Sequence, residues 1–482
     1  MKIKSVQYNI VMNFLRVGFG MLSPLIIMPY INRKFDQKLI GEIEYATTIV
    51  SYFVLIAGLG VSTYGVREIA KIREDLYKRS KFVLEISIIL FFTNLVSYIA
   101  LFIMLYSNFL KNIDIKIIYL FSLNIFFTSF SFEWFYQGIE NQEYITKRSI
   151  FIRVISILLI LMLVKDKEDS VKYVLILVGT FCFSNLLNLL NLKNYIKIDK
   201  NIIENLKIKI HLKNLIFMFG SSIAILIYSQ LDIIMIGNIV GPYYVGLYNI
   251  SIKIIGLGKI LITIVGATLL PRLTNFYFSD LNKEYEMYLK KSLQILILYS
   301  FCAILFLYIN AKEVIYLFGG KEFEEAILTL KLQSVIILFS GLAYFYGVIV
   351  LYSQKKDKPF LCSVTAAALI NIVLNKVMIY KYNQNGAVLA TIVAESFVVL
   401  VIYILERREF KKINFLNLNT LKVVIATLII LILEKYLSIR LFNENTNLNI
   451  FLKNIYLFSI YIMVLIILRE ETLINLIKLK RS

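Results

Sequence analysis

The chain has 482 residues, of which 59% are hydrophobic, and its mean hydropathy is +0.74. Soluble domains stay nearer half apolar, and the apolar residues here form blocks of about 20 instead of an alternating pattern, which argues against a soluble fold and a β-barrel. The formal net charge is +20. Our first interpretation is that basic loops face the cytoplasm, and our second is an anionic substrate. We expect no nucleic acid partner.

The blocks predict an all-α polytopic membrane protein with about 14 transmembrane helices, because a hydrocarbon layer of about 30 Å needs about 20 residues per helix. The first block is too long for a cleavable signal, so we interpret it as a membrane helix. In chain order, the expected spans are residues 10–31, 40–61, 82–107, 113–137, 149–164, 171–192, 214–238, 243–270, 292–310, 325–353, 359–380, 386–405, 419–437 and 448–468.

The loop charges predict the orientation of these spans. Lys and Arg are about twice as frequent in segments on the side of the N-terminus as in segments on the other side, and basic loops stay in the cytoplasm. The largest clusters lie in residues 62–81 and 193–213. We therefore expect both termini in the cytoplasm.

An internal repeat predicts the domain organisation. A shift of 205 residues aligns Gly41 with Gly246 and Arg67 with Arg272, and six spans separate the copies, so the repeat is parallel. Parallel repeats predict two bundles around a central cavity, which favours alternating access. We expect a six-helix bundle in residues 1–205, a second in residues 206–412, and two further helices with a cytoplasmic tail in residues 413–482.

Three basic residues lie inside predicted spans, where ionisable side chains are costly and are functional candidates. Arg16, Lys253 and Lys259 predict a cationic cavity that binds a phosphate-bearing headgroup. Two structural alternatives stay open. Arg16 can extend to the cytoplasmic interface, and Lys253 can pair with Asp232 on the preceding span.

Other charged residues have weaker functional interpretations. Arg67 and Arg272 end their helices on the cytoplasmic side, where they would contact either the substrate headgroup or anionic lipid. Lys376 and Glu395 lie in the eleventh and twelfth spans and are candidates for coupling or gating, as is Asp232. The alternative for Lys376 and Glu395 is a structural ion pair.

The first span contains Pro24 and Pro29. A proline removes a backbone hydrogen bond and bends a helix. These two residues therefore predict either a hinge for gating or a static kink.

The sequence lacks the patterns of several enzyme classes. No GxxxxGK[ST] segment is present, so we expect no ATP hydrolysis. His211 is the only histidine, and the three cysteines form no CxxC pair, which argues against a Ser-His-Asp set, a metal site and a disulfide framework. We expect no cofactor, no metal and no enzymatic activity.

Four segments resemble those of Wzx-type oligosaccharide flippases. They are "FEWFYQGIENQEYITKRSI" from Phe132, "GLYNISIKII" from Gly246, "LLPRL" from Leu269, and "GEIEYA" through "YGVREIAK" from Gly41. These flippases form the polysaccharide transporter branch of the multidrug/oligosaccharidyl-lipid/polysaccharide (MOP) flippase superfamily. The resemblance covers the whole chain, including the two trailing helices.

The resemblance implies translocation of an undecaprenyl-diphosphate-linked oligosaccharide from the cytoplasmic to the outer leaflet of the bacterial plasma membrane, for O-antigen, capsule or exopolysaccharide synthesis. It further implies a monomer in contact with membrane lipids, with a polysaccharide polymerase and a chain-length regulator as partners. Related lipid II flippases use cationic residues of spans 1, 2 and 8, the spans that hold or precede Arg16, Arg67, Lys253 and Lys259 here.

Three alternative functions stay open from the sequence: a drug or cation antiporter, a lipid II flippase, and a membrane polysaccharide polymerase. Arg16 has no acidic neighbour in the sequence, which argues against lipid II as the substrate. An antiporter would need an acidic cavity, and a polymerase would need a large outer loop.

The segment around the single tryptophan is a candidate gate. Trp134, Phe135 and Tyr136 fit an aromatic belt at the membrane interface. Glu133 precedes them and is expected near the cytoplasmic entrance, where it would pair with a basic loop residue.

Overall fold

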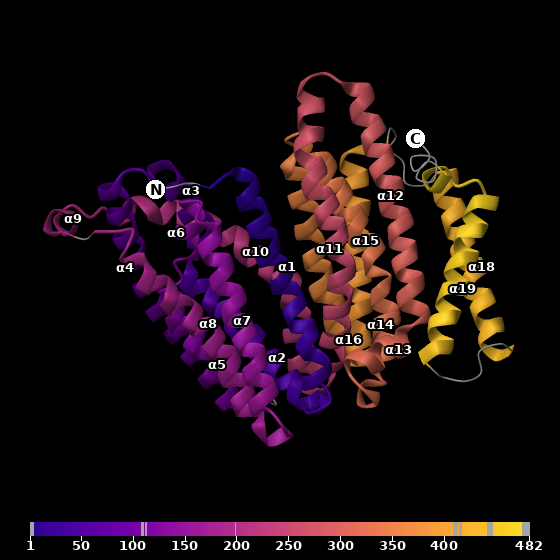
Figure 1. Ribbon diagram of the computed structural model, residues 1–482, viewed down its shortest axis with the longest axis horizontal. Coiled ribbons are helices and arrows are strands. Elements are labelled where there is room, and N and C mark those ends of the chain that lie inside the picture. The colour runs from indigo at the N-terminus through magenta and orange to yellow at the C-terminus, as the bar shows by residue number, and fades with distance from the viewer. Residues whose placement is uncertain are drawn as a thin grey trace. The chain divides into compact units, whose positions relative to one another are not determined.

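The computed structural model describes residues 4–474 except 108–109, 111–112, 198, 408–412, 414–416 and 441–446, and in these residues all regular structure is helical (Figure 1). The chain divides into two compact units. Unit 1 comprises Met1–Asn249 and Phe318–Glu322, and unit 2 comprises Ile250–Leu317 and Phe323–Ser482. The all-α class predicted from the sequence is confirmed.

The described residues of unit 1 form ten α-helices. They are α1 (Val6–Ile31), α2 (Gln37–Gly58), α3 (Val61–Ile72), α4 (Leu76–Tyr106), α5 (Ile115–Thr128), α6 (Glu133–Gly138), α7 (Gln142–Leu163), α8 (Ser170–Leu192), α9 (Lys200–Glu204) and α10 (Lys209–Ile239).

The helix α11 (Pro242–Phe278) begins in unit 1 and continues into unit 2. The remaining helices are α12 (Asn282–Ile309), α13 (Ala311–Phe318), α14 (Ala326–Ser334), α15 (Ile336–Tyr344) with a π-helical continuation (Phe345–Leu351), α16 (Asp357–Leu405), α18 (Leu418–Arg440) and α19 (Asn447–Ile467).

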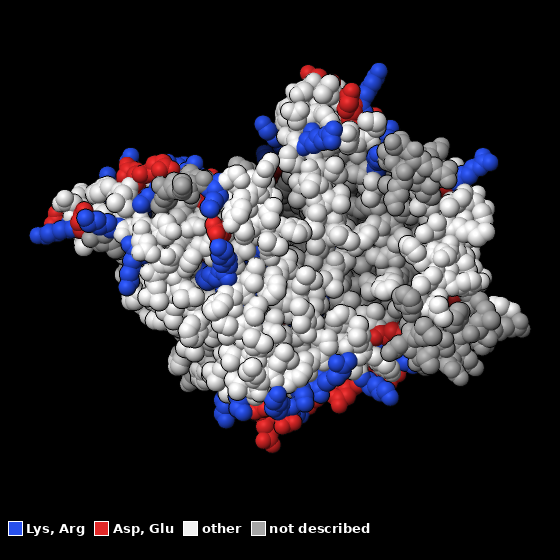
Figure 2. All heavy atoms as spheres, in the orientation of Figure 1, with Lys and Arg blue, Asp and Glu red and all other residues white. Residues whose placement is uncertain are grey.

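Helices occupy all of the predicted spans, but an exact count of fourteen is not confirmed. Nine helices in the described part of the chain are long and apolar enough to cross a membrane, and Ile115–Thr128 and Leu452–Ile467 are shorter apolar helices. Charged side chains gather near helix ends and leave a largely uncharged band between them (Figure 2). Such a band is what a hydrocarbon layer requires.

The 49 residues of α16 fold back on themselves. Asn383 has φ 51° and ψ −134°, which interrupts the helix. The Asn371 amide donates to the Thr391 hydroxyl at 3.3 Å, although a straight helix would place residues 20 apart about 30 Å apart. The helix is therefore a hairpin, with its turn in the loop expected between the spans 359–380 and 386–405.

Contacts between loops in unit 1 follow the predicted alternation of sides. Lys167 pairs with Asp36, and both belong to loops expected outside. The Arg79 guanidinium donates to the Tyr195 carbonyl at 2.8 Å, and Lys4 lies 3.7 Å from Glu143. These four residues belong to segments expected inside.

The segments that the repeat aligns meet within unit 1. A Cβ atom on Gly41 would overlap the Pro242 carbonyl, and a Cβ atom on Gly246 would overlap the Gln37 carbonyl. The same shift of 205 residues relates Gln37 to Pro242 and Gly41 to Gly246. Each copy of the repeat thus makes with the other copy the same contact that it receives. Reciprocal contacts of this kind arise when a twofold axis relates the two copies. Only glycine permits this close backbone approach.

The aromatic cluster of α6 lies in the core of unit 1. Trp134 is 4% exposed, and Phe135 and Tyr136 are 0% exposed. The prediction of an interfacial aromatic belt is therefore wrong. The rings are buried because the short break between α5 and α6 turns them inward against α3 and α4.

Candidate functional site

Glu133, the first residue of α6, forms ion pairs with two arginines from other helices. Arg16 of α1 forms an ion pair with Glu133 Oε1. Arg148 Nη2 of α7 lies 2.9 Å from Glu133 Oε2. The Arg148 side chain is 5% exposed, and it also donates to the Asn188 side chain of α8. The three helices α1, α6 and α7 therefore meet at one carboxylate.

A third arginine, Arg153, lies five residues further along α7. Its Nη1 atom is 3.5 Å from the Ser23 hydroxyl, and a Cβ atom on Gly20 would lie 2.6 Å from the same nitrogen. The absence of a side chain at Gly20 thus gives the guanidinium its place against α1. Among the described residues, no carboxylate forms an ion pair with Arg153.

This arginine cluster, defined as Arg16, Arg148, Arg153 and Glu133, has an excess of positive charge. Three guanidinium groups and one carboxylate leave a formal charge of +2. The Nε atoms of Arg16 and Arg148 are buried and have no hydrogen-bond acceptor among the described residues. The Arg16 side chain is nevertheless 20% exposed. Excess buried charge of this kind needs an anion, and planar guanidinium groups suit phosphate.

The sequence indicated two members of the cluster and not the other two. It identified Arg16 and Glu133 as separate candidates, and the structure brings them together. Arg148 and Arg153 were overlooked as site residues. Arg153 carried a usable signal, because it lies inside the predicted span 149–164 and ionisable residues in spans are functional candidates.

The predicted basic pair on α11 lies in unit 2. Lys253 and Lys259 are both half-buried. Asp232 of α10, the residue proposed to pair with Lys253, accepts a hydrogen bond from the Tyr248 hydroxyl at 2.7 Å. Substrate binding by the two lysines and coupling by Asp232 stay predictions.

The repeat-related arginines stack on aromatic rings. The guanidinium carbon of Arg67 lies 5.6 Å from the Tyr64 ring centre, and that of Arg272 lies 4.5 Å from the Tyr288 ring centre. Arg67 also donates to Glu68 at 3.1 Å. A substrate role for Arg67 and Arg272 stays a prediction.

The remaining candidates occupy different environments. In α16, Lys376 is exposed and forms no ion pair in the described part of the chain, whereas Glu395 is buried. Pro24 and Pro29 lie inside α1, which continues as one helix through both. A coupling role for Lys376 and Glu395 and a hinge role for the two prolines stay predictions. No group of three His, Cys, Asp or Glu residues suited to a metal occurs among the described residues.

The fold and the site define a class, a multi-pass helical membrane transporter. The chain belongs to the polysaccharide biosynthesis protein family, whose model matches residues 6–277. The model of the MatE family matches residues 218–377. The resemblance to Wzx-type oligosaccharide flippases is thereby confirmed.

Two similar curated proteins bear the name "Putative O-antigen transporter". The one from Escherichia coli (strain K12) is 23% identical, with 82% of this chain and 95% of the relative covered. The one from Shigella dysenteriae is 22% identical, with 82% and 98% covered. A capsular polysaccharide biosynthesis protein, CapF of Staphylococcus aureus, is 25% identical over 35% of this chain and 42% of its own length.

Solved structures share the fold. The lipid II flippase MurJ in an inward closed conformation has a TM-score of 0.71 and 15% identity, with 98% of this chain and 100% of that chain covered. An inward-facing multidrug resistance MATE family transporter of the MOP superfamily has a TM-score of 0.63 and 14% identity, with 84% and 99% covered.

Proposed function

We propose that this protein translocates a polyprenyl-diphosphate-linked oligosaccharide across the bacterial plasma membrane, from the cytoplasmic to the outer leaflet. The observation that carries the proposal is the arginine cluster, with its excess of two positive charges and its unsatisfied Nε–H groups. A diphosphate would supply the missing negative charge and acceptor oxygens. An excess of positive charge disfavours a cationic cargo.

Glu133 would act as an internal counter-ion for this substrate. In the structure its carboxylate holds Arg16 and Arg148. An incoming diphosphate would replace that carboxylate as the partner of the guanidinium groups. After translocation, Glu133 would recover both arginines and so favour release. No covalent chemistry is required of the protein, and we therefore infer a transporter without enzymatic activity.

Alternating access would move the bound headgroup between the two sides. The reciprocal approach of Gly41 and Gly246 supports this, because it brings together two segments that the repeat relates and that are both expected on the outer side. We infer cytoplasmic termini from the loop charges. A polymerase that consumes the exported oligosaccharide would act on the outer side.

The test is surface polysaccharide in cells that depend on this protein. Replacing Arg16 with Ala should abolish export at a normal protein level. Lys193→Ala is the matched control, since Lys193 is exposed, forms no ion pair among the described residues and is not a candidate site residue. Full export by the Arg16 variant would contradict the proposed function.

A further inference from the structure

The buried guanidinium of Arg148 has two side-chain partners that differ in charge. Its Nη2 atom lies 2.9 Å from the Glu133 carboxylate of α6, and its Nη1 atom donates to the Asn188 amide oxygen of α8. The same Nη1 atom lies 3.4 Å from the Ser184 carbonyl, one turn earlier in α8. Arg148 therefore joins α7 to both α6 and α8, with a charged partner on one helix and a neutral partner on the other.

Asn188 is held in an orientation that leaves part of its amide without a partner. The residue is 0% exposed, and the Tyr136 hydroxyl of α6 donates to its backbone carbonyl at 2.7 Å. A guanidinium carries only donors, so the amide oxygen faces Arg148 and the amide nitrogen faces away. That nitrogen, Nδ2, is buried and has no acceptor among the described residues. A buried donor without an acceptor destabilises a fold.

Stability alone would favour an aspartate at position 188. An aspartate has nearly the shape of an asparagine, carries two acceptors and no donor when ionised, and would neutralise the buried Arg148. The asparagine instead leaves an N–H group without an acceptor in the described chain, beside a cluster with an excess of positive charge. Residues that break a rule of stability are expected where function requires them. The neutral side chain of Asn188 therefore indicates a functional role.

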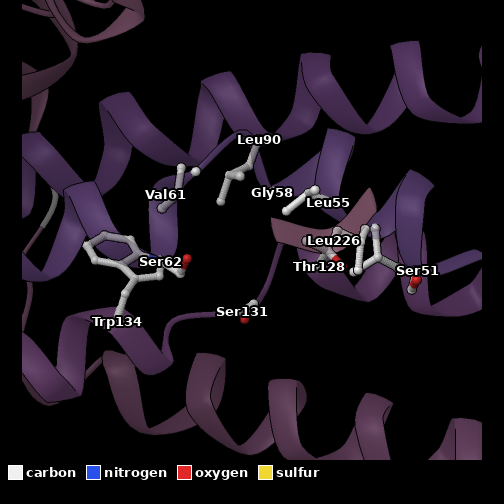
Figure 3. A pocket seen from close by; sticks show the side chains of 12 residues that line it. Ser51, Leu55, Gly58, Val61, Ser62, Leu90, Thr128, Ser131, Trp134 and Leu226 are labelled. Carbon is white, nitrogen blue, oxygen red and sulfur yellow. The ribbon is translucent and has the colours of Figure 1, made fainter. Parts of the chain in front are cut away.

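The cavity beside α6 offers no other source of selection by charge. It has a volume of about 260 Å³ and is lined by residues of α2, α3, α4, α5 and α10, with Trp134 of α6 at one end (Figure 3). None of the lining residues that the structure describes is charged. In this part of unit 1, discrimination between lipid headgroups of different charge falls to the arginine cluster.

The charge of the cluster matches that of a diphosphate. With Asn188 neutral, three guanidinium groups and one carboxylate leave a formal charge of +2. A sugar linked to a lipid through a diphosphate has one negative charge on each phosphate, whereas a sugar linked through a single phosphate has one in all. Coulomb energy scales with the product of the two charges. A cluster with two excess positive charges therefore discriminates between these two lipids more strongly than a cluster with one.

We propose that Asn188 is a specificity-determining residue, which selects a diphosphate linkage over a single phosphate by keeping the arginine cluster at a charge of +2. An aspartate in its place would be ionised beside Arg148 and would reduce the charge of the cluster to +1. This inference rests on the proposed function and deepens it, because it names the residue that selects the linkage of the substrate.

The experiment measures two affinities for the full chain in nanodiscs. The probes are N-acetylglucosamine linked to undecaprenol through a diphosphate and through a single phosphate, so that the two lipids share tail and sugar. We expect the native chain to bind the diphosphate lipid at least tenfold more tightly than the other lipid. Asn188→Asp should bind the diphosphate lipid at least tenfold more weakly than the native chain and prefer it by threefold or less. Its melting temperature should equal or exceed the native one, because Arg148 gains a carboxylate.

Two control variants separate charge from position. Asn201 is exposed and lies in α9, so Asn201→Asp makes the same change of charge away from the cluster and should keep the native preference. Asn188→Ser retains a neutral acceptor at the site. It should lower the melting temperature and weaken the binding of both lipids alike, with the tenfold preference unchanged.

The outcomes separate this inference from the proposed function. A native preference in Asn188→Asp, equal affinities of the native chain for the two lipids, or loss of the preference in Asn188→Ser would each overturn the role of Asn188. So would an Asn188→Asp protein that is less stable than the native chain. Binding of the diphosphate lipid that depends on Arg16 would leave the flippase proposal intact in each of these cases. Failure of the native chain to bind either lipid would overturn both proposals.

Discussion

Replacing Arg153 with Ala should separate substrate binding from protein stability. Arg153 contributes one long contact to the Ser23 hydroxyl, at 3.5 Å, and no ion pair among the described residues. Removal of this half-buried charge should therefore leave the free energy of unfolding unchanged or raise it. A guanidinium–phosphate hydrogen bond contributes about 1.5–3 kcal/mol, so the affinity for undecaprenyl diphosphate should fall about ten- to a hundredfold.

Arg148→Ala provides the contrast. That side chain is 5% exposed and bonds both Glu133 and Asn188. Its loss should lower binding and also destabilise the protein by about 1–3 kcal/mol. Both variants should be compared by thermal unfolding and by lipid titration in nanodiscs. An Arg153→Ala protein of native affinity would refute the assignment of Arg153 to the headgroup site, and one of strongly reduced stability would show a structural role.

Three further changes have distinct expected outcomes. Gly20→Ala should displace the Arg153 guanidinium and reduce transport severalfold, whereas Gly18→Ala, in open space, should transport normally; equal activities would argue against the position of Arg153. Glu133→Gln should bind undecaprenyl diphosphate more tightly but release it more slowly, because the competing carboxylate is lost, and weaker binding would argue against a counter-ion role. His211→Ala should destabilise the protein by about 1–3 kcal/mol, measured by thermal unfolding, because the buried ring bridges Glu85 at 2.9 Å and Tyr64 at 2.8 Å; an unchanged stability would show that this network contributes little.

The helices were predictable because their signal is local. Long apolar blocks require only composition and length, and the polar segment around Asn383 indicated the turn inside α16. The break between α5 and α6 was not predictable in the same way. The residues from Ser129 to Phe132 alternate serine with phenylalanine and include no proline, glycine or charge, so hydropathy does not mark the end of a helix that stops at Thr128.

The site was only partly predictable because its contacts are distant in sequence. Arg16 and Glu133 are 117 residues apart, and no neighbour of Arg16 indicated an acidic partner. The pairing depends on α1 packing against α7 beside the short helix α6. Conversely, the alignment of Gly41 with Gly246 needed no structure, because a repeat leaves equal spacing in the chain. Its consequence, the reciprocal backbone contact, became visible only in three dimensions.

The most direct test of the central claim is lipid translocation by the purified protein in proteoliposomes. Undecaprenyl-diphosphate-linked N-acetylglucosamine would be placed in one leaflet, and its arrival in the other leaflet would be followed by enzymatic modification of the exposed sugar. The native protein and Lys193→Ala should translocate the lipid at the same rate, while Arg16→Ala, Arg148→Ala and Arg153→Ala should be slower by at least tenfold. Native rates in all three arginine variants, at equal amounts of folded protein, would contradict the claim that this cluster carries the headgroup.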